Sequence, residues 1–191
     1  MKLFGPLYDR VLTWSRHPKA PWYLGGLSFA ESSFFPIPPD VMLAPMALAQ
    51  PKSWLRLALL TTLASVLGGL LGYLIGWTAL DLFMPWIERM EYTPKLVQAQ
   101  QWFEQWGFWA VLLAGFSPIP YKAFTITAGG LGMALLPFML ASFIGRGGRF
   151  FLVAFLMARF GPAAEARLKP AIEWLGWGTV ALAVLAYAML R

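Results

Sequence analysis

Two short proline-rich stretches decide the expected fold: residues 34–40 read FFPIPPD, and residues 116–122 read FSPIPYK. Both contain the pattern Phe-x-Pro-Ile-Pro, and the second copy begins 82 positions after the first. Apolar segments of about 9–14 residues flank each stretch, which is too short for a helix to cross a hydrocarbon core of about 30 Å. Proline ends a helix and frees backbone polar groups. Those groups survive at membrane depth only inside protein or beside a wet cavity.

We therefore expect two re-entrant helical hairpins, over residues 22–50 and 107–131. The hairpin-breaking residues are Pro36, Pro38, Pro118 and Pro120. The alternative is a pair of ordinary kinked helices, each with a surface loop at its prolines.

The composition places this chain in a membrane. Of its 191 residues, 59% are apolar and 13% are charged, whereas soluble domains are about 45–50% apolar and about 25% charged. One soluble core of this size cannot hide that much apolar surface, and such a chain is not disordered. We expect one all-α integral membrane domain over residues 1–191. The absence of cysteine and the single His17 exclude disulfides and a metal cluster, so no metal or cofactor is expected.

Further segments complete the predicted architecture. Residues 57–80, 133–158 and 174–190 are expected to span the membrane. Residues 1–21 and 81–106 are expected to contain amphipathic interfacial helices, the second beginning at Thr93-Pro94.

A second sequence match supports an inverted repeat. Residues 63–65 read LAS and are followed by Gly68, and residues 140–142 read LAS and are followed by Gly145. Each half would then consist of a broken hairpin and a spanning helix, and paired broken segments typically mark a transporter's binding site. Small residues at spacing four in the first span, Gly68, Gly72 and Gly76, are expected to let another helix pack closely.

The basic residues predict the orientation. One side would hold nine of them: Lys2, Arg10, Arg16, Lys19, Lys52, Arg56, Arg159, Arg167 and Lys169. The other side would hold three: Arg89, Lys95 and Arg191. By the positive-inside rule the N-terminus is cytoplasmic and residues 81–106 face outward. The net charge of +6 therefore indicates cytoplasmic loops rather than nucleic-acid binding.

Five ionisable residues in the apolar regions are candidates for function: Glu31, Asp40, Lys122, Arg146 and Arg149. Charge at that depth is costly and usually paired. Asp40 and Lys122 close the two proline turns at matching positions, so they are expected to approach each other. Two acids against three bases leave one spare positive charge, which suits a phosphate.

Glu31 and Asp40 are the candidates for proton coupling, because a carboxyl group removed from water binds a proton more readily. The anion-binding candidates are Lys122, Arg146 and Arg149. The alternative is that Glu31 is bound to Arg146 or Arg149 and only holds the fold.

Several motifs together resemble the DedA family, also called the SNARE-associated Golgi protein or VTT-domain family, and its YqaA-like bacterial branch. They are Glu31-x4-Pro36-x-Pro38-x-Asp40, Gly68-x3-Gly72-Tyr73, the 116–122 turn, Gly129-Gly130 and Gly145-Arg146-Gly147-Gly148-Arg149. The resemblance implies two opposed re-entrant hairpins in a bacterial inner-membrane protein linked to envelope homeostasis and proton motive force. It also implies transport of undecaprenyl phosphate or scrambling of phospholipids. Many members carry two arginines around the second turn. This chain has Ser117 and Lys122 there, so Arg146 and Arg149 are expected to supply the charge.

These observations predict a proton-linked flippase or scramblase of a lipid phosphate. The expected partners are membrane lipids and protons, with a possible homo-oligomer. Two alternatives stay open: a proton-coupled carrier of small solutes or ions, and a non-transporting membrane scaffold. An enzyme is not expected, since the sequence offers no nucleophile–base pair or metal site.

Overall fold

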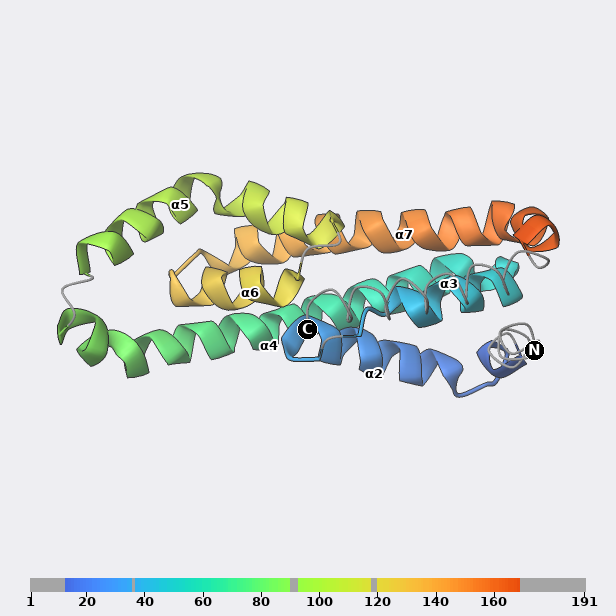
Figure 1. Cartoon of the computed structure of the whole chain (residues 1–191), viewed down its shortest axis with the longest axis horizontal. Helices are drawn as coiled ribbons and strands as arrows, with labels where there is room; N and C mark the ends of the chain where they lie inside the picture. Colours follow the sequence, from blue (N-terminus) through green and yellow to red (C-terminus); the bar gives the residue numbers. More distant parts are fainter. Residues whose placement is uncertain (1–12, 36, 90–92, 118–119, 169–191) are drawn as a thin grey trace, which may run out of the picture.

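A computed structural model describes residues 13–35, 37–89, 93–117 and 120–168, and every regular element in these ranges is helical (Figure 1). The elements are α2 (Ala20–Ser33), α3 (Asp40–Ala49), the short 3-10 helix η1 (Pro51–Ser53), α4 (Trp54–Arg89), α5 (Thr93–Phe116), α6 (Tyr121–Gly130) and α7 (Leu135–Leu168). This confirms the all-α prediction for the described part of the chain.

Two stretches of helix are long and apolar enough to cross a membrane: Pro51–Leu80 and Leu135–Gly161. They overlap two of the three segments expected to span, 57–80 and 133–158. The third, residues 174–190, lies outside the described residues, and so do residues 1–12 of the expected N-terminal interfacial helix. Large side chains such as Leu59, Leu63 and Leu67 are exposed along one face of α4. Apolar surface of this extent belongs in lipid rather than in water, consistent with a membrane protein.

The helix bounds differ from expectation between residues 81 and 116. We expected a separate interfacial segment over 81–106, but residues 81–89 continue α4, which has 36 residues and a length of about 54 Å. Residues 93–106 are the first part of α5. Pro85 lies inside α4 without ending it. With 24 residues in α5, the first arm of the second hairpin is longer than the arms of about 9–14 residues expected from the sequence.

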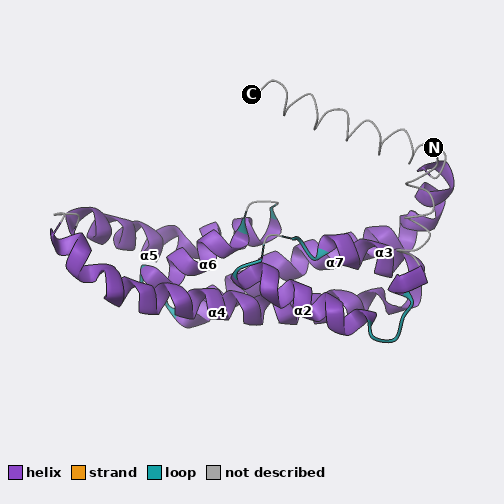
Figure 2. Cartoon of the chain, turned by 60° about the horizontal axis from the view of Figure 1, so that its bottom comes forward, coloured by secondary structure: helices purple, strands orange, loops and turns teal. Residues whose placement is uncertain are grey.

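The helices form two hairpins around two long helices (Figures 1 and 2). The hairpin of α2 and α3 enters from one end of the long axis, the hairpin of α5 and α6 enters from the other end, and both turn near the middle. Helix α4 packs against α2 and α6, and α7 packs against α5 and α3. Each long helix thus contacts the first arm of its own half and the second arm of the other half, an arrangement that an inverted repeat would produce.

The hairpin turns begin and end at backbone features that the sequence encodes. Helix α2 ends where the backbone N–H groups of Phe34 and Phe35 both donate to the carbonyl of Ala30, at 2.8 Å. Helix α3 begins directly after Pro39, and α6 begins directly after Pro120, whose backbone is extended. Pro38 lies in the first turn, whereas Pro36 and Pro118 lie outside the described residues.

Glycines let the helices of the bundle approach closely. The position of a Cβ on Gly68 is occupied by the backbone of Phe29 in α2, and that of a Cβ on Gly76 by the backbone of Ile126 in α6. Gly72 faces the Thr125 side chain. Gly145 of α7 likewise meets backbone atoms of α5. The stripe predicted for helix packing therefore lies against α2 and α6.

The buried apolar residues form two clusters. One joins α2, α3, α4 and α7 and contains Ala20, Leu24, Leu43, Met46, Ala47, Leu57, Ala58, Phe150 and Ala154. The other joins α5, α6 and α7 with the turn that precedes α7, and contains Phe103, Val111, Tyr121, Ala128, Met133, Phe138 and Ala141. Each hairpin has its own apolar core, and the polar side chains described next lie where the two cores meet.

Candidate functional site

Arg146 is the centre of a buried polar network that joins three helices. Its Nε donates to Ser65 Oγ of α4 at 2.6 Å, and its Nη2 donates to Ser32 Oγ of α2 at 3.2 Å. The same Nη2 forms an ion pair with Glu31 Oε2. The hydroxyls of Ser32 and Ser65 share a hydrogen bond of 2.7 Å. The Arg146 side chain is 2% exposed and that of Glu31 is 15% exposed, so this pair lies in the protein interior.

Two aromatic rings hold the Arg146 guanidinium from its other sides. Its Cζ lies 4.8 Å from the centre of the Tyr121 ring and 4.7 Å from that of Phe150, within the range of a cation–π interaction. Tyr121 belongs to the α5–α6 core and Phe150 to the α2–α3 core. Arg146 therefore joins the two halves of the molecule and is compensated by charge, hydrogen bonds and aromatic faces.

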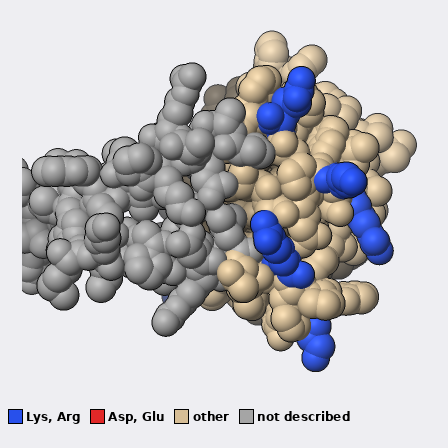
Figure 3. Space-filling model, turned by 90° about the vertical axis from the view of Figure 1, so that its right-hand side faces the viewer, with Lys and Arg blue, Asp and Glu red and all other residues tan. Residues whose placement is uncertain are grey.

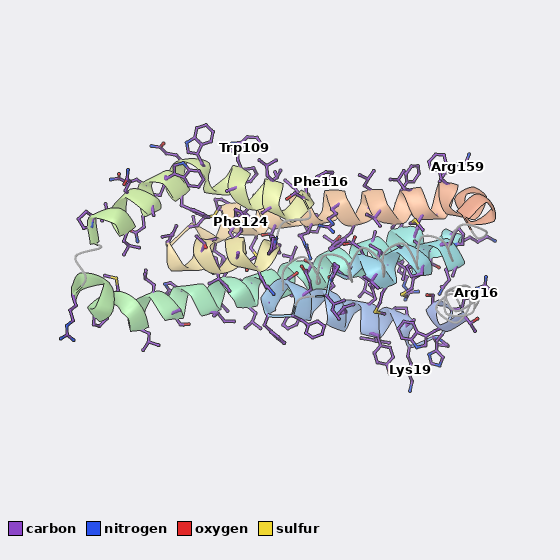
Figure 4. The ribbon with its side chains drawn as sticks, in the orientation of Figure 1. Arg16, Lys19, Trp109, Phe116, Phe124 and Arg159 are labelled. Atoms are coloured by element: carbon purple, nitrogen blue, oxygen red, sulfur yellow. The ribbon has the colours of Figure 1, made fainter. Side chains whose placement is uncertain are left out.

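Arg149, one helical turn further along α7, connects the two hairpin tips. Its Nη2 lies 2.6 Å from Asp40 Oδ2 at the start of α3, and its Nη1 donates to the Ser117 carbonyl at 2.7 Å. Ser117 directly follows Phe116, which Figure 4 shows near the middle of the long axis. The Arg149 and Asp40 side chains are 19% and 22% exposed. This second ion pair is thus more open than the first.

Two buried polar atoms beside Arg149 are left without a hydrogen-bond partner among the described residues: Asp40 Oδ1 and Ser117 Oγ. Buried polar groups normally have a partner. Both atoms belong to the tip residues that Arg149 contacts, so the tip region retains capacity to bind a further polar group.

Lys122 provides the uncompensated charge at the tips. It lies in the first turn of α6 and is half-buried. Within the described residues, the ion pairs are Glu31 with Arg146 and Asp40 with Arg149, which leaves the Lys122 ammonium without a carboxylate. The five predicted site residues therefore carry one net positive charge, as the sequence indicated.

The pairing within this set differs from the expected one. We expected Asp40 to approach Lys122 because the two residues occupy matching positions in the turns, but Asp40 binds Arg149. The fork of an arginine side chain reaches two groups at once and fits a carboxylate well. Glu31 is bound to Arg146, which is the geometry of the structural alternative.

Sequence reasoning missed the neutral members of the site. They are Ser32, Ser65, Tyr121 and Phe150, together with the Ser117 carbonyl. A signal for two of them was present, because serines within apolar helices prefer to hydrogen-bond across helix interfaces. The rings carried no such signal, since aromatic residues are frequent throughout the chain. Among the described residues, no group of three or more acidic or histidine side chains could hold a metal ion.

Comparisons with known proteins match residues 37–159 to the VTT domain. The chain is 48% identical over 191 residues to an uncharacterized protein of Haemophilus influenzae and 46% identical over 191 residues to one of Histophilus somni, with full coverage of both chains in each case. It is 30% identical over 120 residues to undecaprenyl phosphate transporter A of Staphylococcus aureus, which covers 57% of this chain and 58% of that protein. No solved structure matches the chain significantly.

Proposed function

The chain belongs to the VTT domain family, and from this premise we propose that it is a bacterial inner-membrane transporter of a lipid with an anionic phosphate group. Undecaprenyl phosphate and phospholipids both have this chemistry. The similarity to a transporter of undecaprenyl phosphate supports the transport role. The family comparison favours this role over an enzyme.

The observation that carries the proposal is the charge at the two hairpin tips. Arg149 contacts both tips, and Lys122 in the second tip has no carboxylate among the described residues. A phosphate could bind Lys122 and share Arg149 with Asp40, because guanidinium and ammonium groups are the preferred phosphate partners in proteins. The exposed apolar faces of the long helices would leave the lipid tails in the bilayer during passage.

Proton coupling would act through the same ion pair. A proton on Asp40 removes its negative charge and frees Arg149 for the anion, so the proton and the phosphate would bind together. Asp40 also has one buried carboxylate oxygen without a partner among the described residues. Glu31 is the second proton-coupling candidate, but its carboxylate is bound to Arg146 and Ser32 within the buried network. We therefore assign the proton-coupling role to Asp40 rather than to Glu31.

A reconstituted transport assay tests the proposal. The protein would be placed in liposomes that contain phosphatidylglycerol or polyprenyl phosphate with a fluorescent label on the tail. A membrane-impermeant quencher added outside would then report how much labelled lipid reaches the outer leaflet. The measurement would be made with and without a pH gradient. We expect Lys122→Gln to slow translocation at least tenfold, because one charge-assisted hydrogen bond contributes about 1.5–3 kcal/mol. Lys52→Gln, the same substitution at an exposed site away from the tips, should leave the rate within twofold. Asp40→Asn should remove the dependence on the pH gradient.

The outcome against the proposal is equally specific. If the wild-type protein moves neither lipid under any gradient, lipid-phosphate transport is wrong. If Lys122→Gln and Asp40→Asn both transport like the wild type, the tips are not the site. Uptake of a small solute without lipid movement would favour a proton-coupled solute carrier.

A scaffold without transport is the second candidate, and one observation favours it. The Arg146 network joins α2, α4, α6 and α7 with its guanidinium held from all sides, as expected of a group that fixes the fold. A chain that complements a deletion strain while moving no lipid in liposomes would support this role instead.

A further inference from the structure

One end of the molecule is strongly basic. Arg16, Lys19, Lys52, Arg56 and Arg159 are exposed. Figure 3 looks onto this end and shows basic side chains without an acidic one beside them, and Figure 4 labels Arg16, Lys19 and Arg159 there. Among the side chains that the structure describes at this end, none is acidic. Such a surface attracts the anionic lipids of a cytoplasmic leaflet.

A groove of about 450 Å³ opens at this end, between the N-terminal parts of α2 and α4. This volume is typical of small-molecule sites, which occupy about 300–1,000 Å³. Its lining contains none of the five charged site residues.

The walls of the groove change from polar to apolar along α4. Arg56 and Ser53 line one part, and Leu59 and Leu63 line the other. Arg56 and Leu63 are seven residues apart, which is about 10 Å along a helix axis. That separation suits a lipid whose phosphate binds the arginine while the first part of its acyl chain lies on the leucines.

A tryptophan on the opposite wall supports a position of the groove at the membrane surface. Trp22 of α2 lines the groove and is 80% exposed, and tryptophan is enriched at the level of lipid headgroups. The Arg56 and Ser53 side chains form no ion pair or hydrogen bond with another described residue. No described side chain therefore competes with a ligand for these two polar groups.

We propose that this groove is a binding site for an anionic phospholipid of the adjacent leaflet, with its phosphate on Arg56 and an acyl chain along Leu59 and Leu63. The site is separate from the tip charges and does not require transport. It would hold a lipid at the protein surface whether or not the tips move one.

Lipid binding to the purified full-length protein tests this site. Native mass spectrometry would measure the first bound molecule of palmitoyl-oleoyl phosphatidylglycerol and, separately, of the phosphatidylcholine with the same chains. We expect the wild type to bind phosphatidylglycerol more tightly. Arg56→Gln should weaken that binding about tenfold, whereas Arg159→Gln, an equal loss of charge at the same end outside the groove, should change it less than twofold.

A second variant tests the apolar part of the groove. Leu59→Trp keeps every charge but fills the space of the acyl chain, and it should weaken binding of both lipids. Unfolding midpoints of all variants should match that of the wild type, since Arg56, Leu59 and Arg159 are exposed.

Two results would overturn the proposal. One is an equal loss of phosphatidylglycerol affinity in Arg56→Gln and Arg159→Gln, which would mean that the lipid is attracted by the overall charge of this end. The other is equal binding of the two lipids to the wild type. Translocation by Arg56→Gln at the wild-type rate would leave the tip site and the groove as separate functions.

Discussion

Glu31 and Arg146 stand 115 positions apart in the sequence and form an ion pair between α2 and α7. The two residues belong to different halves of the chain, and the rings of Tyr121 and Phe150 place their contact between the two apolar cores. A buried ion pair contributes less to stability than the attraction between its charges suggests. Removing only one of the two charges, however, strongly destabilises the protein, because the other charge is left buried without a partner. We therefore expect the pair to help determine how the two halves fit together.

Removing Arg146 alone should destabilise the protein more than removing both partners. Arg146→Met leaves a largely buried carboxylate without its partner, and the free energy of unfolding should fall by about 3–5 kcal/mol. The double variant Arg146→Met with Glu31→Leu replaces both charges by apolar groups and should recover a large part of that loss. Equilibrium unfolding in detergent measures both. A double variant as unstable as the single one would show that the serine and aromatic contacts, rather than the ion pair, determine the effect.

Adding a methyl group at Gly76 should separate α4 from α6. Its Cβ would occupy the position of the Ile126 carbonyl, and overpacking of this kind costs about 1–3 kcal/mol. Gly26 of α2 provides the control, because a Cβ there meets no atom within 4 Å. Gly26→Ala should be neutral or stabilising by up to about 1 kcal/mol, since alanine favours helix over glycine. Thermal unfolding of the two alanine variants compares them, and equal midpoints would contradict close packing at Gly76.

The sequence was sufficient for the helical class, and the charged residues that it singled out lie close together in two ion pairs. The proline turns and the long apolar runs predicted hairpins and spans whose helices the structure contains, and ionisable residues stand out in apolar surroundings because their burial is costly. The extent of α4 and α5 could not be read in the same way. Residues 81–106 mix polar and apolar side chains, and whether such a segment continues a helix depends on the partners it packs against.

The pairing of charges was also beyond the sequence. The matching positions of Asp40 and Lys122 in the two turns suggested that these two residues form a pair. In the structure, Arg146 and Arg149 lie one turn apart on α7, and each binds a different acid. Arg146 faces Glu31 and Arg149 faces Asp40, and the neighbouring Gly145 lets α7 approach the backbone of α5 closely. Contacts between distant segments carry no local signature in the chain.

Lysine at position 149 should weaken transport more than stability. The two terminal nitrogens of Arg149 bind groups on different tips, Asp40 and the Ser117 carbonyl, whereas a lysine ammonium is a compact point charge. Arg149→Lys should retain the contact with Asp40, lose about 1 kcal/mol of stability with the second hydrogen bond, and slow lipid translocation about tenfold. Arg159→Lys, at an exposed position of the same helix, is the matched control. Full transport by Arg149→Lys would exclude a need for contact with both tips.

Cysteine labelling should place the basic end in the cytoplasm. The chain has no cysteine, so a single introduced thiol reports one position without background. Lys19 lies at the basic end (Figure 4), and α5, which contains Glu104, begins at the opposite end (Figure 1); both side chains are exposed. By the positive-inside rule, a membrane-impermeant maleimide should label Lys19→Cys in inverted vesicles but not in intact spheroplasts, and Glu104→Cys only in spheroplasts. The reverse pattern would invert the orientation. Labelling of both positions from one side would mean that the two hairpins enter the membrane from the same face, which would exclude an inverted repeat.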